Sequence, residues 1–376
     1  MTTEVVHVHA GNLYGGIETV LATLARHAGA SPDLRHRFVL CFDGRLAAEL
    51  RAAGAQVDLL GATRVSRPWT VARARSGLRD LLATSRPGVA MCHSAWSQAI
   101  FGPVLGAARV PAAFWLHGAA DGRHWLERWA RRTPPSLVIC GSRFTLASAP
   151  LLFPSARAVL VHIPVARPQP PAMDRAALRS TLGAAAGTCA IVQVSRMEAG
   201  KGQRVLLEAL ALLKDRAGWV CWMVGGAQRG AEVAYENGLR RMARTEGIES
   251  RVRFLGERSD VSTVLGGADI FCQPNIAPEA FGVSFVEALY CGLPVVGGRI
   301  GATPEIVDDS CGVLVEPGNA RALADALGRL LDDPGRRSAL AAAGPARAEA
   351  LCEPERQVRA LAAELRRLTA GTRAAA

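Results

Sequence analysis

Short apolar runs alternate with longer amphipathic stretches along the whole chain. Such runs occupy residues 5–10, 37–42, 88–93, 112–117, 136–141, 188–194, 219–224, 251–256, 269–274 and 293–298. Nearly continuous apolar runs of this length are typical of strands buried on both faces of a parallel sheet. The stretches between them, for example 17–28 and 69–83, have the length and periodicity of helices. The pattern therefore predicts an α/β fold in which each half of the chain is a doubly wound sheet covered by helices.

A proline-rich stretch over residues 163–173 separates the two halves. Proline cannot continue a helix or a central strand, so this stretch is the expected interdomain linker. We expect a first domain over residues 1–165 and a second over residues 166–352. Residues 353–376 should form a C-terminal helix and tail that return toward the first domain, because apolar side chains recur at helical spacing there: Val358, Leu361, Ala362, Leu365 and Leu368.

Length and composition agree with two buried cores. The 376 residues are 49% hydrophobic and 20% charged, and no uninterrupted apolar run reaches about 18 residues. The first residues lack the basic-then-apolar pattern of a secretory signal, so we expect a cytoplasmic protein. The nine cysteines are widely spaced within apolar runs and are expected to be buried hydrophobic residues. No combination of histidine and cysteine has the spacing of a metal site, so no metal is expected.

Positive charge is concentrated in the first half of the chain. Of the net charge of +11, residues 1–165 carry +9, from 18 Arg and 9 Asp or Glu. This excess could attract phosphates, nucleic acid or an anionic membrane. Residues 64–82 and 124–132 are arginine-rich and contain tryptophans, including Trp125 and Trp129. They predict either a peripheral membrane contact or ordinary solvated helices with a buried tryptophan face.

Residues 278–296 contain two glutamates, Glu279 and Glu287, eight positions apart around a glycine turn and a predicted helix start. At that start, with Glu287 in the first helical turn, backbone N–H groups should be free to bind a diphosphate, and Glu287 could accept hydrogen bonds from a ribose diol. The amides concerned belong to Gly282, Val283, Ser284 and Phe285. An equally weighted interpretation is a capping box between Ser284 and Glu287.

Two cations precede another predicted helix. Arg196 and Lys201 lie in the loop after the strand at residues 188–194. Arginine can bind two phosphate oxygens at once and lysine adds a point charge, so the pair could neutralise a departing diphosphate. The alternative is a pair of solvated loop cations. No D-x-D pair that would hold a catalytic divalent metal occurs in the sequence.

The order of motifs across residues 188–318 resembles that of the retaining GT-B glycosyltransferases of family four. The motifs are S-R-x4-K-G, V-x-F-L-G, E-x7-E, A-x-x-C-G-x-P-V-V and G-x-x-P-E-I-V. The resemblance implies two Rossmann-like domains facing a cleft, an acceptor-binding first domain and a donor-binding second domain. It implies that Glu279 lies against the donor sugar, that Glu287 holds the ribose and that Arg196 and Lys201 bind the diphosphate.

The same resemblance implies that the amides of Val283, Ser284 and Phe285 contribute to the diphosphate site. Residues near Phe254 and Leu255 would line the nucleobase pocket, mostly through backbone. Together these positions would form a donor site that needs neither a metal nor another cofactor.

The first domain matches the family more loosely. Gly15 and Gly16 lie between a predicted strand and helix, where bare backbone can approach a phosphate or sugar, although glycines in a tight turn need no ligand. His117, followed by Gly118, resembles the family histidine that faces the donor sugar. Many relatives have Asp after this histidine, and a histidine at a strand end can also be purely structural.

The predicted function is therefore retaining, metal-independent transfer of a sugar from a nucleoside-diphosphate donor, with UDP or GDP as carrier, to a hydroxyl acceptor. The acceptor could be a small molecule, a glycan or a lipid-linked molecule, the last with the enzyme peripheral at the inner face of the membrane. One alternative is a nucleotide-sugar 2-epimerase of the same fold. The other is a basic nucleic-acid-binding protein, which low aromatic content disfavours, so no nucleic-acid partner is expected.

Overall fold

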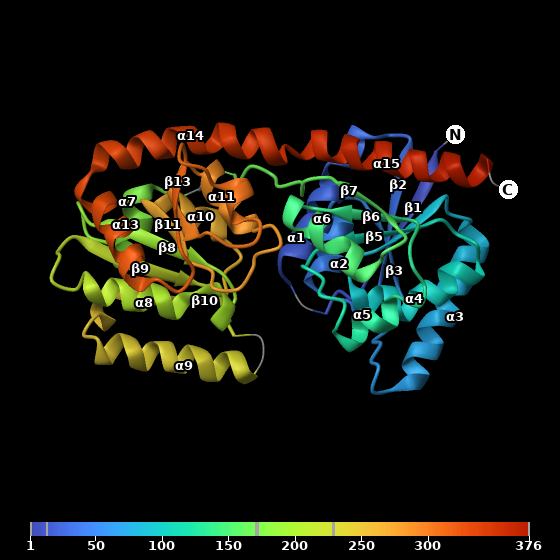
Figure 1. The fold of residues 1–376 in the computed structure, drawn as a ribbon, viewed down its shortest axis with the longest axis horizontal. Helices are drawn as coiled ribbons and strands as arrows, with labels where there is room; N and C mark the ends of the chain where they lie inside the picture. Colours follow the sequence, from blue (N-terminus) through green and yellow to red (C-terminus); the bar gives the residue numbers. More distant parts are fainter. Residues whose placement is uncertain (1, 13, 170–172, 228–229, 375–376) are drawn as a thin grey trace. The chain divides into compact units, whose positions relative to one another are not determined.

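The computed structural model describes residues 2–12, 14–169, 173–227 and 230–374 (Figure 1). It divides into two compact units. The first unit comprises Met1–Ala166 and Cys352–Ala376, and the second comprises Arg167–Leu351. The boundary at residues 166 and 167 falls within the proline-rich stretch, of which residues 170–172 lie outside the described residues.

The first unit is built on a seven-stranded sheet with all pairings parallel, in the order β3-β2-β1-β4-β5-β6-β7. The strands are β1 Thr3–His9, β2 Leu34–Leu40, β3 Gln56–Leu59, β4 Val89–Cys92, β5 Ala112–Leu116, β6 Leu137–Cys140 and β7 Arg157–Leu160. The strand order reverses direction between β1 and β4. In open α/β sheets such a switch point opens a crevice at the carboxyl ends of the strands.

The second unit repeats this architecture with six parallel strands in the order β10-β9-β8-β11-β12-β13. The strands are β8 Cys189–Val194, β9 Trp219–Val224, β10 Val252–Gly256, β11 Ile270–Gln273, β12 Val295–Gly298 and β13 Gly312–Val315. Here the switch point lies between β8 and β11. Both units are therefore Rossmann-like, and the predicted GT-B fold class is confirmed.

The helices connect successive strands. In the first unit they are α1 Gly16–Arg26, η1 Ala28–Ala30, α2 Arg45–Ala52, α3 Pro68–Ser85, α4 Ala95–Ala107, α5 Trp125–Ala130 and α6 Arg143–Leu152. In the second they are α7 Arg175–Thr181, η2 Ala199–Lys201, α8 Gln203–Leu212, α9 Gly230–Thr245, η3 Glu249–Arg251, α10 Val261–Gly267, α11 Val283–Tyr290, α12 Thr303–Ile306 and α13 Ala320–Asp332, followed by α14 Pro334–Cys352 and α15 Pro354–Ala374. Several begin at side-chain caps, such as Ser94 before α4 and Asn319 before α13.

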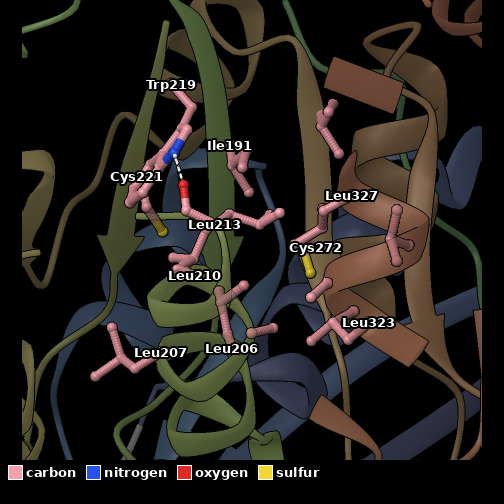
Figure 2. Packing of buried hydrophobic residues seen from close by; sticks show 14 of the residues in the cluster. Ile191, Leu206, Leu207, Leu210, Leu213, Trp219, Cys221, Cys272, Leu323 and Leu327 are labelled. Carbon is pink, nitrogen blue, oxygen red and sulfur yellow. Dashed lines mark hydrogen bonds between the residues drawn. The ribbon is translucent and has the colours of Figure 1, made fainter. Parts of the chain in front are cut away.

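Apolar side chains at helical spacing form the core of the second unit (Figure 2). Leu206 and Leu210 of α8, with Leu323 of α13, are fully buried against side chains of β8 and β11. The Trp219 indole is buried in the same cluster and donates a hydrogen bond of 3.1 Å to the Leu213 carbonyl oxygen. This core fixes the strand ends that carry the candidate site.

All ten predicted strands are present, but three strands were missed. These are β3, β7 and β13, which lie at the edges of the two sheets. β3 has polar and exposed positions and so lacks the continuous apolar run of a central strand, whereas β7 and β13 are short, largely apolar strands whose side chains are mostly only partly buried. The cysteines are all free, and all are buried apart from Cys291, which is partly buried.

The predicted C-terminal helix is α15, and it packs on the first unit. Val358, Leu361, Ala362 and Leu365 are buried, and the helix contacts η1, α1 and β4. At its surface the Arg366 guanidinium donates hydrogen bonds of 2.7 and 2.6 Å to the two carboxylate oxygens of Asp33. The last helix of the chain thus completes the unit that contains the first strand.

Candidate functional site

The site in the second unit lies at the carboxyl ends of β8 and β11, on either side of the switch point. Lys201 ends η2 in the loop between β8 and α8. Asn275 is the second residue after β11, and Glu279 lies farther along the same loop between β11 and α11. The sheet therefore brings together two segments that are almost 80 residues apart in the sequence.

Glu279 is the centre of a hydrogen-bonded network. Its Oε2 accepts a hydrogen bond from Lys201 Nζ at 2.6 Å and another from Asn275 Nδ2 at 2.9 Å. Gln273 Nε2 donates to Asn275 Oδ1 at 3.1 Å, and Ser284 Oγ donates to Gln273 Oε1 at 3.2 Å. The Glu279 side chain is only 14% exposed. Because both hydrogen bonds end on Oε2, Oε1 has no hydrogen-bond partner among the described residues.

Glycines allow the loops of this network to pack closely. Gly202 has φ +74°, and a Cβ there would lie 1.9 Å from the Pro274 carbonyl oxygen. Gly301 has φ +62°, and a Cβ there would lie 2.4 Å from both the backbone N and O of Glu279. Only glycine fits such positions. The glycine of the K-G motif therefore holds Lys201 next to Glu279.

The N-terminus of α11 adjoins this network. Gly282 is the N-cap, with φ +100°. A side chain at this position would collide with the ring of Phe285 and with Glu279 Cγ. The N–H groups of Gly282, Val283 and Ser284 have no hydrogen-bond partner within the described residues. The prediction that the Phe285 amide is free was wrong, because this N–H donates to the Gly282 carbonyl oxygen at 3.1 Å. The Phe285 side chain is fully buried in the core.

Glu287 lies in the second turn of α11, so its predicted place in the first turn was wrong. The capping-box interpretation also fails, because Gly282 rather than Ser284 caps the helix and Ser284 bonds to Gln273. The Glu287 carboxyl group is partly buried and has no hydrogen-bond or ion-pair partner among the residues described here. Burial raises its pKa from 4.5 to about 7.

Arg196 is paired differently from Lys201. Its guanidinium lies 2.8 Å from a Glu198 carboxylate oxygen and 3.9 Å from one of Glu232, and its side chain is 37% exposed. The loop that carries it is held by Gln203, whose Nε2 donates to the Arg196 carbonyl oxygen at 2.7 Å. Arg196 is therefore not a freely solvated cation, but its exposed side chain can still reach an anion.

Phe254 and Leu255 lie on the edge strand β10 and are partly buried. The Arg240 guanidinium lies over the Phe254 ring, 4.4 Å from its centroid. Gly256, which follows, accepts a 2.8 Å hydrogen bond from the backbone of Gly225 at the end of β9. The Phe254 side chain thus has a structural contact, which fits the implication of the resemblance that a nucleobase contact at Phe254 would involve its backbone.

In the first unit Gly15 is the N-cap of α1, with φ −170°, and Gly16 is the first residue of the helix. A Cβ at Gly15 would meet no atom closer than 3.7 Å. Neither the backbone angle nor the packing within the described residues therefore requires a glycine at position 15. This weakens the interpretation that Gly15 only serves a tight turn.

His117 follows β5 and stacks on Trp115, with the ring centroids 5.3 Å apart. Its Nε2 lies 3.1 Å from Nδ1 of the buried His93. Burial and the nearby His9 lower the pKa of His117 from 6.5 to about 3, so the ring is neutral near pH 7. Sequence analysis gave no role to His93, Gln273 or Asn275, although each is a polar residue at or just past the carboxyl end of an apolar strand, which is a usable signal.

Part of this chain is similar to a known protein family. The sequence profile of the family described as "Glycosyl transferases group 1" matches residues 174–347, which contain Arg196, Lys201, Glu279 and Glu287. The match covers less than half of the chain, and over these residues the chain is similar to the glycosyl transferases group 1 family. The group 1 match covers the whole Glu279 network and the N-terminus of α11.

Curated relatives of the chain include two mannosyltransferases. The GDP-mannose-dependent monoacylated alpha-(1-6)-phosphatidylinositol monomannoside mannosyltransferase of Corynebacterium glutamicum is 36% identical over 47% of this chain and 47% of its own length. The lipopolysaccharide core biosynthesis mannosyltransferase LpsB of Rhizobium meliloti is 28% identical over 65% of this chain and 69% of its own length. The chain thus spans about half the length of the first of these relatives.

Among solved structures, HepE of Anabaena in complex with UDP-glucose has a TM-score of 0.86 and 22% identity, covering 96% of this chain and 99% of that one. A glycosyltransferase from Rickettsia africae has a TM-score of 0.82 and 18% identity, with 98% of each chain covered. At these identities the likeness shows the shared GT-B fold.

Within the described residues, no group of three or more His, Cys, Asp or Glu side chains is arranged to hold a metal ion. Over the same residues, no helix combines the length and hydropathy needed to cross a membrane.

Proposed function

We propose that this protein is a retaining glycosyltransferase that moves a sugar from a nucleoside-diphosphate donor to a hydroxyl acceptor without a metal ion. The observation that supports the proposal most directly is the Lys201–Glu279–Asn275 network beside the N-terminus of α11, within the region of the group 1 match. A cation, unpaired amides and a carboxylate with one unused oxygen lie in adjacent loops. This is the chemistry that a sugar diphosphate requires.

The proposed reaction breaks the bond between the anomeric carbon and the diphosphate oxygen. The acceptor hydroxyl attacks on the same face of the sugar, and its proton passes to the departing diphosphate. Lys201, Arg196 and the amides of Val283 and Ser284 would stabilise the negative charge on the leaving group. Glu279 Oε1 would accept a hydrogen bond from a sugar hydroxyl, and Glu287 would accept hydrogen bonds from the ribose.

Roles for the remaining candidates follow from the resemblance and stay predictions. Gly15, Gly16 and His117 would contact the donor from the first unit, and the backbone near Phe254 and Leu255 would contact the base. The first unit would bind the acceptor. UDP and GDP are the proposed carriers, because the Corynebacterium glutamicum relative is GDP-mannose-dependent and the HepE structure contains UDP-glucose.

Thermal unfolding with nucleotides tests the donor site. UDP, GDP, ADP and dTDP are added in turn, each with magnesium and with EDTA, to the wild type, Lys201→Ala and the control Lys214→Ala. We expect one nucleotide to raise the midpoint of unfolding equally with and without magnesium, since a ligand that binds only the native state stabilises it. Lys201→Ala should lose most of this stabilisation. Lys214, the other lysine of the chain, is exposed at the end of α8, and its variant should keep it.

Two results would count against the proposal. If no nucleotide stabilises the protein, the donor site is wrong. If the stabilisation appears only with magnesium, the metal-independent mechanism is wrong. A nucleotide that binds can then be supplied as its sugar conjugate, and formation of a C2 isomer rather than transfer or hydrolysis of the sugar would favour the epimerase alternative.

Contact with an anionic membrane is a second part of the proposal. Trp69, at the start of α3, is 68% exposed, and Trp125, at the start of α5, is 49% exposed. The interpretation of a fully buried tryptophan face therefore does not apply to these two residues. Both lie in arginine-rich segments of the basic first unit, which favours acidic lipid head groups and a lipid-linked acceptor. In a sedimentation assay the protein should pellet with anionic vesicles. If the same amount pelleted with neutral vesicles, this part of the proposal would be contradicted.

A further inference from the structure

A row of four histidines crosses the sheet of the first unit. His36 lies on β2, His7 on β1, His93 just after β4 and His117 just after β5. Their ring nitrogens are hydrogen-bonded in sequence, with His36 Nδ1 to His7 Nε2 at 2.8 Å, His7 Nδ1 to His93 Nε2 at 2.9 Å and His93 Nδ1 to His117 Nε2 at 3.1 Å. We call these four residues the histidine row. It links a side chain in the interior of the sheet to the candidate residue at its carboxyl edge.

Strand register explains why the four rings meet. His36 pairs with Val5, and His7 lies two residues beyond Val5 on β1. His7 pairs with Met91, and His93 lies two residues beyond it. The same step leads from His93 to His117. Because side chains two apart lie on the same face of a strand, all four rings share one face and advance diagonally toward the carboxyl edge.

The number of protons allows only two arrangements. Each neutral imidazole has one N–H and one bare nitrogen, and each of the three contacts needs one proton. Four protons therefore satisfy three bonds and leave one N–H at an end of the row. Either every ring is protonated at Nδ1 and His117 Nδ1 carries the terminal N–H, or every ring is protonated at Nε2 and the terminal N–H is on His36.

The two ends differ in their surroundings. His36 Nε2 is fully buried and has no partner among the described residues. His117 is partly exposed, and its Nδ1 also has no partner there. A buried N–H without an acceptor costs more than a buried bare nitrogen, so the terminal proton belongs on His117. Burial lowers the pKa of His7, His36 and His93, which keeps the rings neutral as the proton count requires.

We propose that His36, His7 and His93 are positioning residues that fix His117 as its Nδ1–H tautomer, so that His117 offers a hydrogen-bond donor and not a base. The proton count and the buried end of the row carry this inference. That the acceptor is an oxygen of the donor sugar rests on the proposed function. His117 would then orient a sugar hydroxyl or ring oxygen by donating to it, without taking a proton in the reaction.

Nitrogen NMR of the ligand-free protein tests the tautomers directly. In protein labelled with ¹⁵N-histidine, long-range proton–nitrogen correlations distinguish Nδ1–H from Nε2–H rings, and each signal is assigned by its loss in a single variant. We expect all four rings of the row to be Nδ1–H at pH 7.5. In His93→Phe the His117 tautomer ratio should shift toward Nε2–H by about five- to tenfold, the size of a typical hydrogen-bond contribution.

Two variants serve as controls. His93→Asn places an amide near the former Nδ1 and should restore the Nδ1–H form of His117, which also covers the case in which His93→Phe fails to fold. His27→Gln removes a histidine outside the row and should change nothing. An Nε2–H ring at His117 in the wild type, or an unchanged tautomer in a folded His93→Phe protein, overturns the proposal.

Kinetics separate this inference from the proposed function. With an active sugar donor, His93→Phe should lower kcat with little change in KM, and His93→Asn should recover most of it. If no donor is turned over by the wild type, the proposed function is in doubt while the tautomer result stands. If turnover is normal but the His117 tautomer is Nε2–H, the proposed function stands and the role of the histidine row is wrong.

Discussion

Glu279 and Glu287 belong to one motif but have different surroundings. Lys201 and Asn275 hold the Glu279 carboxylate, whereas Glu287 has no such partner among the described residues and is partly buried. Burial without a compensating charge raises the pKa of Glu287 to about 7. Near neutral pH a substantial share of Glu287 is therefore protonated, which makes it the residue most sensitive to pH in the proposed donor site.

Affinity for the sugar nucleotide should therefore rise with pH. Below pH 7 Glu287 is mostly protonated and accepts hydrogen bonds from a ribose diol poorly, and above pH 7 it is a carboxylate. Titration calorimetry between pH 6 and 8 should show affinity increasing by about tenfold at most, the effect of one ionisation over one pH unit. A sugar nucleotide is used because its diphosphate has no group that titrates near 7. Glu287→Gln should bind the sugar nucleotide weakly and with no pH dependence. If the affinity of the wild type were also independent of pH, the assigned role of Glu287 would be wrong.

At the scale of elements, the packing of one loop on one strand end positions the site. The turn before α8 lies against the end of β11 because Gly202 has no side chain. Gly218, before β9, also has a left-handed backbone, with φ +78°, but a Cβ there would meet nothing within 4 Å. Both glycines have a left-handed backbone conformation, but only Gly202 also lies too close to a neighbouring backbone to carry a side chain.

Replacing each glycine by alanine separates these two effects. Gly218→Ala should lower the free energy of unfolding by about 1 kcal/mol, from backbone strain alone. Gly202→Ala should cost about 2–4 kcal/mol, because the methyl group must also displace the Pro274 backbone. It should also weaken nucleotide binding through Lys201. Urea unfolding of both variants measures the loss of unfolding free energy in each. Equal losses would mean that the loop relaxes freely around the added methyl group.

Sequence patterns predicted central elements better than peripheral ones. Strands buried on both faces, such as β8 and β9, are continuous apolar runs, whereas edge strands such as β3 have polar and exposed positions that resemble loops. Motif spacing placed Lys201 and Glu279 correctly in loops after strands. It could not show that they form an ion pair, because that contact depends on strand order. The histidine row likewise depends on register between four strands, which no local pattern encodes.

The stability of the whole molecule should depend on acid through the histidine row. In the unfolded chain these histidines have pKa values near 6.5, but in the folded protein the pKa of His36 is about 4 and those of His7 and His93 are well below 6.5. The unfolded state therefore binds more protons below pH 6.5. Their contribution to stability is complete above pH 6.5 and is lost as the pH falls toward the folded values. Glu287 and Glu127, whose pKa values are raised by burial, act in the opposite direction but are fewer than the histidines of the row.

The free energy of unfolding should therefore fall steeply between pH 6.5 and 5, by roughly 1.4 kcal/mol per pH unit for each of these histidines. Urea unfolding at a series of pH values measures the slope. His36→Phe removes one of the groups and should reduce the slope by about one proton, while His27→Gln, which changes a partly exposed histidine outside the row, should leave it unchanged. A wild-type stability that is constant over this range would show that the row is not held neutral.

The place of α15 in the fold has a consequence for protein synthesis. The second unit is one continuous stretch of chain that precedes α15, so it can begin to fold before α15 has been made. The first unit begins earlier but needs α15, which is made only after the whole second unit. Until then the apolar surface on η1, α1 and β4 that α15 covers is exposed to chaperones and to other nascent chains. An isolated first domain produced by stopping at the linker would keep that surface uncovered, and joining residues 352–376 directly after residue 166 is the rational way to make it.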